Sequence, residues 1–281
     1  MFKRETSELS DGINKVKKFM LESNSIDIVT FEGCPTKSNR VTALFDKFIC
    51  DSIKNENNLE EYFKENFLEN SQYHEEILRK VDIINKSDLR WFVLVHDEDL
   101  ISVLFRIESP SKFHKVNTFR DPESFANWFY YSFSEIRERI SRYEEKNLPI
   151  FDKRMRKSKK PWPGNVDGIL FFDNSPKYII EFQTTKRYPV IEHDNNDWMK
   201  ATTRRKGDAK RWQSIKNVSE TLKLPILVAV WSPNEDNFKL RKINSFRMNN
   251  GLPEKIIWEE DYLYDDVKNK NFDRLIFFLN R

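Results

Sequence analysis

The sequence from Val166 to Gln183 carries the strongest structural signal in the chain, and it reads Val166-Asp167-Gly168-Ile169-Leu170-Phe171-Phe172, Asp173-Asn174-Ser175-Pro176 and Lys177-Tyr178-Ile179-Ile180-Glu181-Phe182-Gln183. Two apolar runs flank a short polar turn, which predicts a β-hairpin. If the hairpin folds symmetrically about Asn174, Asp167 lies opposite Glu181, and Gln183 shares their face. Facing carboxylates are destabilising without compensation, and their hard oxygen atoms suit magnesium, so the pattern predicts a metal site.

The segments that follow the hairpin add a helix and a buried strand. Trp212, Ile215, Val218 and Leu222 recur at helical spacing. The continuous apolar run over 224–231 is typical of a strand that is buried on both faces. The sequence therefore predicts a hairpin, a helix and a central strand, in that order.

The arrangement of Asp167, Glu181 and Gln183 around a hairpin turn resembles the motif of the PD-(D/E)xK nuclease superfamily. The core of that superfamily also has a hairpin, a helix and a central strand in this order. The resemblance covers residues 161–233. Gln183 stands where the superfamily usually has Lys, as in a variant found in some type II restriction endonucleases, and Val166 stands where it usually has Pro. The resemblance implies an α/β fold with a restriction-endonuclease-like core, a mixed central sheet flanked by helices.

The resemblance also implies the roles of the site residues. Asp167 and Glu181 would bind Mg²⁺, for which Mn²⁺ can substitute, and Gln183 would orient the attacking water. Glu144, on an upstream helix, and Lys210, at the start of the following helix, are accessory candidates. For Glu144, a surface ion pair with a neighbouring arginine is the favoured alternative. For the three motif residues, the alternative is an ordinary hairpin with Glu181 facing solvent.

Two basic clusters flank the hairpin. Basic groups beside a carboxylate centre suit a polyanionic substrate, so these residues are candidates for binding nucleic acid, although a charge run is often only solvated surface. The first cluster comprises Lys153, Arg154, Arg156, Lys157, Lys159 and Lys160, and the second comprises Arg204, Arg205, Lys206 and Arg211.

Composition sets broader limits. The 281 residues carry a net charge of +3, with 33% charged and 38% hydrophobic residues, which is typical of a globular protein. The sequence contains no apolar run of 18 residues, so no membrane-spanning helix is predicted. The sequence has two cysteines, Cys34 and Cys50, so a disulfide framework is not expected. A cytoplasmic location is expected, because the cytoplasm keeps thiols reduced.

The chain is expected to have two regions. Residues 1–120 would form a mainly helical α+β region for recognition, dimerisation or regulation, and residues 121–281 would form the nuclease domain. Within the first region, 41–50 and 59–68 read as amphipathic helices, whereas 89–95 and 100–107 read as paired strands. A helix is expected to begin after Asp121-Pro122.

Together these features predict a Mg²⁺-dependent endonuclease that hydrolyses the phosphodiester bonds of DNA, either a type II restriction enzyme or a phage-defence nuclease. RNA is not excluded as a substrate, and a homodimer is plausible by analogy with restriction enzymes. Two alternatives stay open. One is a catalytically inactive nuclease fold that binds nucleic acid, because the usual Lys is missing. The other is an interaction protein or regulatory subunit whose basic runs are only surface.

Overall fold

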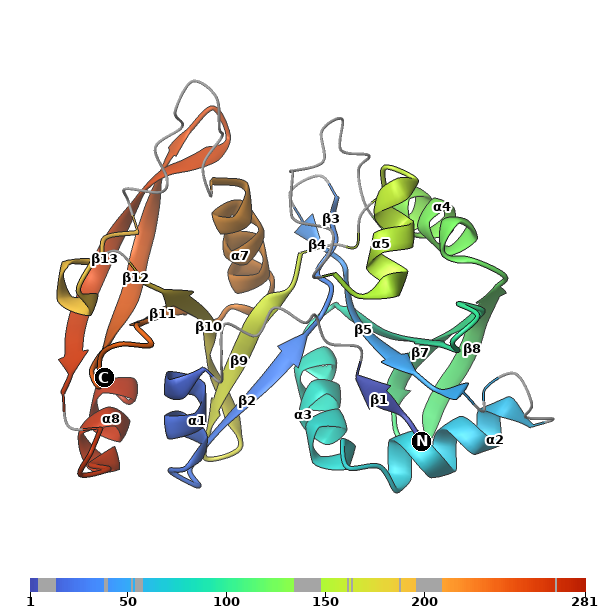
Figure 1. Cartoon of the computed structure of the whole chain (residues 1–281), viewed down its shortest axis with the longest axis horizontal. Helices are drawn as coiled ribbons and strands as arrows, with labels where there is room; N and C mark the ends of the chain where they lie inside the picture. The colour runs from blue at the N-terminus through green and yellow to red at the C-terminus, as the bar shows by residue number, and fades with distance from the viewer. Residues whose placement is uncertain are drawn as a thin grey trace. The chain divides into compact units, whose positions relative to one another are not determined.

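The computed structural model describes residues 1–4, 14–37, 40–51, 53, 58–133, 148–160, 162, 164–186, 188–195, 209–265 and 267–281, with the side chain of Lys210 excepted. The chain divides into two compact units (Figure 1). Unit 1 comprises Met1–Ser10 and Phe31–Asn165, and unit 2 comprises Asp11–Thr30 and Val166–Arg281. Unit 1 is therefore largely an insertion into the chain of unit 2, and the division differs from the predicted boundary at residue 120.

Unit 2 is built on a six-stranded mixed sheet in the order β13-β12-β11-β10-β9-β2. β10 pairs with β9 in antiparallel and with β11 in parallel orientation, and the remaining pairs along β11, β12 and β13 are antiparallel. Its strands and helices are α1 (Lys15–Leu21), β2 (Ile26–Phe31), β9 (Val166–Phe172), β10 (Ser175–Thr184), the 3-10 turn η4 (Val190–Glu192), α7 (Ala209–Leu222), β11 (Ile226–Trp231), β12 (Phe238–Asn249), β13 (Leu252–Tyr264) and α8 (Phe272–Leu279). The predicted hairpin, helix and buried strand are confirmed as β9–β10, α7 and β11.

Helices cover both faces of this sheet. α1 and α8 contribute Phe19, Met20 and Phe278 to the apolar core on one face, against strand residues such as Ile180 and Ala229. Because side chains alternate along a strand, Glu181 and Val228 project from the opposite face, where α7 packs. Trp212 of α7 is fully buried there, as are most residues of its predicted apolar stripe.

Unit 1 contains a second mixed sheet, in the order β1-β5-β6-β7-β8. β5 is parallel to β6, and the pairs β1–β5, β6–β7 and β7–β8 are antiparallel. Its strands and helices are β1 (Lys3–Arg4), the two-residue strands β3 (Thr36–Lys37) and β4 (Arg40–Val41), β5 (Ala43–Ile49), α2 (Leu59–Phe63), the π-helix η2 (Lys64–Glu69), α3 (His74–Asn85), β6 (Arg90–His96), β7 (Ser102–Ser109), β8 (Lys112–Phe119), α4 (Pro122–Phe133) and α5 (Ile150–Lys157).

Several predictions for this region can be compared with the elements of unit 1. Helical structure over 59–68, the paired strands β6 and β7, and the helix that begins after Asp121 are confirmed. The helix predicted over 41–50 is wrong, because β5 occupies this position. β5 pairs on both edges and is buried on both faces, so its apolar residues lack the alternation of a surface strand and imitate helical spacing.

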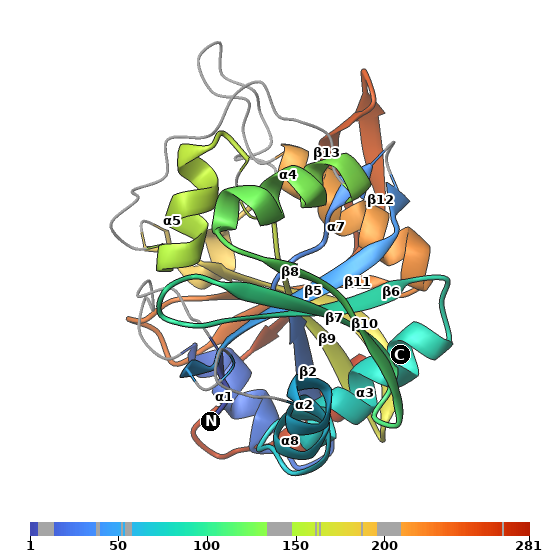
Figure 2. The ribbon, with the colours of Figure 1, turned by 90° about the vertical axis from the view of Figure 1, so that its right-hand side faces the viewer.

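Helices also lie on both faces of the unit 1 sheet (Figure 2). α4 and α5 pack aromatic and aliphatic residues, among them Phe125, Phe129 and Met155, against one face. On the other face the ring of Phe63 stacks on Phe105 with centroids 3.9 Å apart. The expectation of a mainly helical N-terminal region is therefore not met, whereas an α/β fold with mixed sheets flanked by helices is confirmed.

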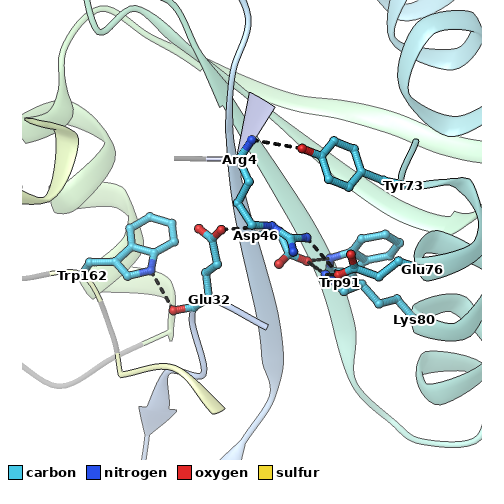
Figure 3. A network of polar contacts seen from close by, with 8 residues as sticks. All are labelled: Arg4, Glu32, Asp46, Tyr73, Glu76, Lys80, Trp91 and Trp162. Carbon is cyan, nitrogen blue, oxygen red and sulfur yellow. Dashed lines mark hydrogen bonds and ion pairs between the residues drawn. The ribbon is translucent and has the colours of Figure 1, made fainter. Parts of the chain in front are cut away.

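Unit 1 buries a network of charged groups (Figure 3). Asp46 is fully buried, and its Oδ2 accepts hydrogen bonds from Nζ of Lys80 over 2.7 Å and from Nε1 of Trp91 over 2.8 Å. Arg4 donates to Glu76 over 2.9 Å and lies 3.3 Å from Glu32. Because opposite charges are paired, the network offsets the cost of burying them.

No helix in the described part of the chain is long and apolar enough to cross a membrane.

Candidate active site

The turn of the hairpin in unit 2 consists of Asp173 and Asn174. Both have positive φ, 48° and 61°, as the two central residues of a type I′ turn require, and Asp and Asn tolerate this conformation well. The turn pairs Phe172 with Ser175. The loop is thus centred between Asp173 and Asn174, rather than on Asn174.

A β-bulge then restores the predicted pairing. The register shifts by one residue between Pro176 and Tyr178, after which Tyr178 pairs with Leu170 and Ile180 pairs with Gly168. One residue further in this register, Asp167 faces Glu181. The two carboxylates therefore meet as predicted, but through a two-residue turn and a bulge.

Gly168 lets the neighbouring strand approach next to Asp167. A Cβ atom at this position would lie 2.4 Å from Cγ2 of Ile28 in β2 and 3.0 Å from Cγ2 of Ile180 in β10. Such separations are far below van der Waals contact. The glycine is thus required by close packing on both sides of β9.

Asp167 and Glu181 differ in their surroundings. Asp167 accepts a hydrogen bond at Oδ2 from the backbone N–H of Phe182 over 2.9 Å, and its side chain is partly exposed. The side chain of Glu181 is only 3% exposed. Burial and the neighbouring charge of Asp167 raise the pKa of Glu181 well above its usual value, although Arg211 opposes this shift. The ionised form of Glu181 therefore needs a cation beside the two carboxylates.

Arg211 supplies that cation in this structure. Its Nε donates to Oε1 of Glu181 over 2.6 Å, and its Nη2 donates to Oδ1 of Asp167 over 3.2 Å. Arg211 lies in the first turn of α7, four residues before the buried Ile215, and so on the helix face that points toward the sheet. One guanidinium group therefore bridges both carboxylates.

Gln183 has a different partner. Its Oε1 accepts a hydrogen bond from Nδ2 of Asn195. The segment that contains Asn195 is also held by residues of β12. Lys239 donates to the carbonyl oxygens of Ile191 over 2.9 Å and His193 over 2.7 Å, and Arg241 forms an ion pair with Asp194 at 3.4 Å. Gln183 thus helps to fasten the segment 190–195 to the sheet face that carries Glu181.

The structure accounts for the other predicted site residues to different extents. Arg211 is the one basic candidate seen to contact the carboxylates in the described residues. The first basic cluster belongs to unit 1, in and just after α5, with Arg154, Lys157 and Lys159 exposed. Glu144, Arg204, Arg205 and Lys206 lie outside the described residues, as does the side chain of Lys210.

Three polar residues near the site were not predicted from the sequence: Asn195, Lys239 and Arg241. Lys239 and Arg241 are buried. In the sheet, Val230 of β11 pairs with Gln183 on one side and Lys239 on the other. Val228 pairs in the same way with Glu181 and Arg241. Alternating Lys and Arg in β12 signals a polar face, but only the strand register places that face beside the carboxylates.

The donor set at Asp167 and Glu181 fits a hard divalent cation in chemistry, because both ligands are carboxylates. No group of three or more His, Cys, Asp or Glu side chains that could hold a metal ion occurs among the described residues. Two carboxylates are a ligand number that magnesium accepts, since it commonly keeps several waters and uses substrate phosphates.

Comparisons of the chain with protein family models, with curated proteins and with solved structures found no match.

Proposed function

We propose that the chain is a Mg²⁺-dependent endonuclease that hydrolyses phosphodiester bonds of DNA, as a restriction or phage-defence enzyme. The observation that carries the proposal is the convergence of Asp167 and Glu181 on a single cationic group within a largely apolar hairpin. Buried like charges are costly, so their presence in one place favours a functional role over a structural one.

The order of elements supports the same proposal. The hairpin β9–β10, the helix α7 and the buried parallel strand β11 follow one another as in the core of the PD-(D/E)xK superfamily that the sequence resembles. A restriction-endonuclease-like core remains part of the proposal.

Each residue has a role in the proposed reaction. Asp167 and Glu181 hold magnesium, which when bound activates water and offsets negative charge on the reacting phosphate. The backbone N–H of Phe182 keeps Asp167 in place, and Gln183 together with Asn195 provides amide groups that orient water. Arg211 provides positive charge for the nucleic-acid backbone.

A second function has specific support, namely metal-independent binding of nucleic acid by an inactive nuclease fold. Gln183 replaces the usual Lys and accepts a hydrogen bond from Asn195, and Arg211 already pairs with both carboxylates. Such a protein would bind DNA with an affinity that falls steeply with salt and does not change on adding magnesium.

A cleavage panel distinguishes the two functions. Supercoiled plasmid, linear duplex, single-stranded DNA and RNA are incubated with the protein in Mg²⁺, Mn²⁺ or EDTA. The proposed nuclease cuts at least one DNA substrate with a divalent metal and none in EDTA. Salt-sensitive DNA binding without cutting in any metal would favour the inactive fold, and absence of both cutting and binding would favour an interaction protein.

A further inference from the structure

One guanidinium group occupies the space between the two carboxylates. Arg211 contacts Oε1 of Glu181 at 2.6 Å and Oδ1 of Asp167 at 3.2 Å. One oxygen of each carboxylate thus points at the same guanidinium group. A metal ion bound between both carboxylates would lie within a few ångströms of this guanidinium group, where two cations repel strongly.

The two carboxylates depend on Arg211 to different degrees. The other oxygen of Asp167, Oδ2, is held by the N–H of Phe182, so this carboxylate keeps one fixed partner if Arg211 leaves. Glu181 is nearly inaccessible to solvent and requires a neighbouring cation whenever it is ionised. Departure of Arg211 while Glu181 stays ionised is therefore favourable only when another cation takes its place.

Arg211 itself has room to leave. Its side chain is 43% exposed, and it projects from the first turn of α7. Arginine has a long flexible stem and a weakly hydrated head group that also pairs well with phosphate. A partly exposed arginine on a flexible stem is thus suited to exchange its partners.

We propose that Arg211 is a tethered counterion that competes with the divalent metal for Asp167 and Glu181. Arg211 holds the site together in the absence of metal, and metal binding displaces it. The affinity of the site for metal is therefore set in part by Arg211. This inference rests on the proposed function, because it requires that the carboxylates bind metal.

Metal titration by calorimetry tests the competition directly. Mn²⁺ is titrated into the unmodified protein, into Arg211→Gln and into Arg211→Lys, in the absence of nucleic acid. Removal of the competing charge is expected to tighten Mn²⁺ binding by about tenfold or more in Arg211→Gln. Arg211→Lys keeps the charge but cannot bridge two carboxylates with a planar guanidinium group. Its affinity for Mn²⁺ should therefore lie between that of the unmodified protein and that of Arg211→Gln.

A matched control separates this effect from a change in net charge. Lys216 is on the same helix and forms an ion pair with Glu220, away from the two carboxylates. Lys216→Gln removes the same charge and is expected to leave Mn²⁺ affinity unchanged.

Thermal unfolding provides a second readout. Without metal, Arg211→Gln should melt at a lower temperature than the unmodified protein, because it leaves Glu181 buried without its counterion. Saturating Mn²⁺ should raise its melting temperature by more than it raises that of the unmodified protein. If Arg211→Gln does not fold without metal, Arg211→Lys supplies the same comparison.

The possible results distinguish the two proposals. Equal or weaker Mn²⁺ binding by Arg211→Gln, with clear binding by the unmodified protein, would overturn the competition and leave the metal site standing. Absence of Mn²⁺ binding by every variant would overturn the metal-dependent function and the competition with it.

Discussion

The backbone N–H of Phe182 donates to Oδ2 of Asp167 over 2.9 Å, so the strand that carries Glu181 also positions the opposing carboxylate. Arg211 contacts both carboxylates, but Asp167 is also fixed by the main chain, whereas Glu181 depends on the side chain of Arg211. The two carboxylates of the site therefore have separate means of support, one rigid and one able to move.

Substitution of Gly168 should destabilise unit 2. A Cβ atom would lie 2.4 Å from Cγ2 of Ile28, so Gly168→Ala forces β2 or its side chain to shift. We expect a loss of about 1–3 kcal/mol in the free energy of unfolding, measured by urea denaturation. Combining it with Ile28→Ala, which removes the clashing methyl group, should cost less than the sum of the two single changes. Additive costs would contradict the steric explanation.

The buried pair of Lys80 and Asp46 should matter far more than an exposed pair of the same length. Nζ of Lys80 lies 2.7 Å from Asp46, and Nζ of Lys86 lies 2.7 Å from Asp82, but only the first pair is buried. Asp46→Ala should cost roughly 3 kcal/mol or more, because the buried Lys80 keeps only Glu76, at 2.7 Å, and the N–H of Trp91 loses its acceptor. Asp82→Ala should cost less than about 1 kcal/mol. Similar costs for the two variants in chemical denaturation would show that burial is not the deciding factor.

Glu32 should make the stability of the protein depend on pH. Burial, with a further contribution from Asp46, raises the pKa of Glu32 to about 8. Between its ordinary pKa and about pH 8, the folded protein binds a proton that the unfolded chain has released, so this group's contribution to stability falls as pH rises. The loss should be on the order of 2–4 kcal/mol and should level off above the folded pKa.

Glu32→Gln provides the test of this linkage. The amide does not titrate, so the variant should lose less stability than the unmodified protein between pH 5 and pH 9 in urea denaturation. Parallel stability profiles for the two proteins would show that Glu32 titrates normally.

Gln183 and Asn195 should act together on the segment 190–195. Each substitution to Ala breaks the same hydrogen bond, so the double variant should be little worse than either single one, with a coupling of about 1 kcal/mol. Hydrogen exchange of 190–195 should become faster in both single variants. A coupling near zero would mean that the two side chains do not hold each other in solution.

Much of the hairpin and the segment that follows it was predictable, because local pattern dominates there. Alternation places Glu181 and Gln183 on one face, and the spacing of Trp212 and Ile215 identifies α7. The contact of Arg211 with the carboxylates had a visible signal, its position four residues before Ile215. Arg211 was predicted to bind nucleic acid, and a basic residue of the segment 204–211 was predicted as a source of positive charge in place of the missing Lys.

The features that were missed depend on long-range pairing. Residues 11–30 join unit 2 because β2 lies beside β9 in the sheet, and no local pattern reveals a strand pair separated by more than a hundred residues. The helix expected over 41–50 failed because β5 is central in its sheet, which hides the alternation of an ordinary strand. Lys239 and Arg241 were missed because their place beside the site follows from the register of β11 and β12.

The most direct test of the central claim compares Glu181→Gln with Glu259→Gln in plasmid nicking with Mn²⁺. Both variants lose one carboxylate of unit 2, but Glu259 is exposed on β13. We expect the nicking rate of Glu181→Gln to fall by roughly a hundredfold or more, since Glu181 is a proposed metal ligand, and that of Glu259→Gln to match the unmodified protein. Equal nicking by Glu181→Gln and the unmodified protein would contradict the assignment of Asp167 and Glu181 as the catalytic site.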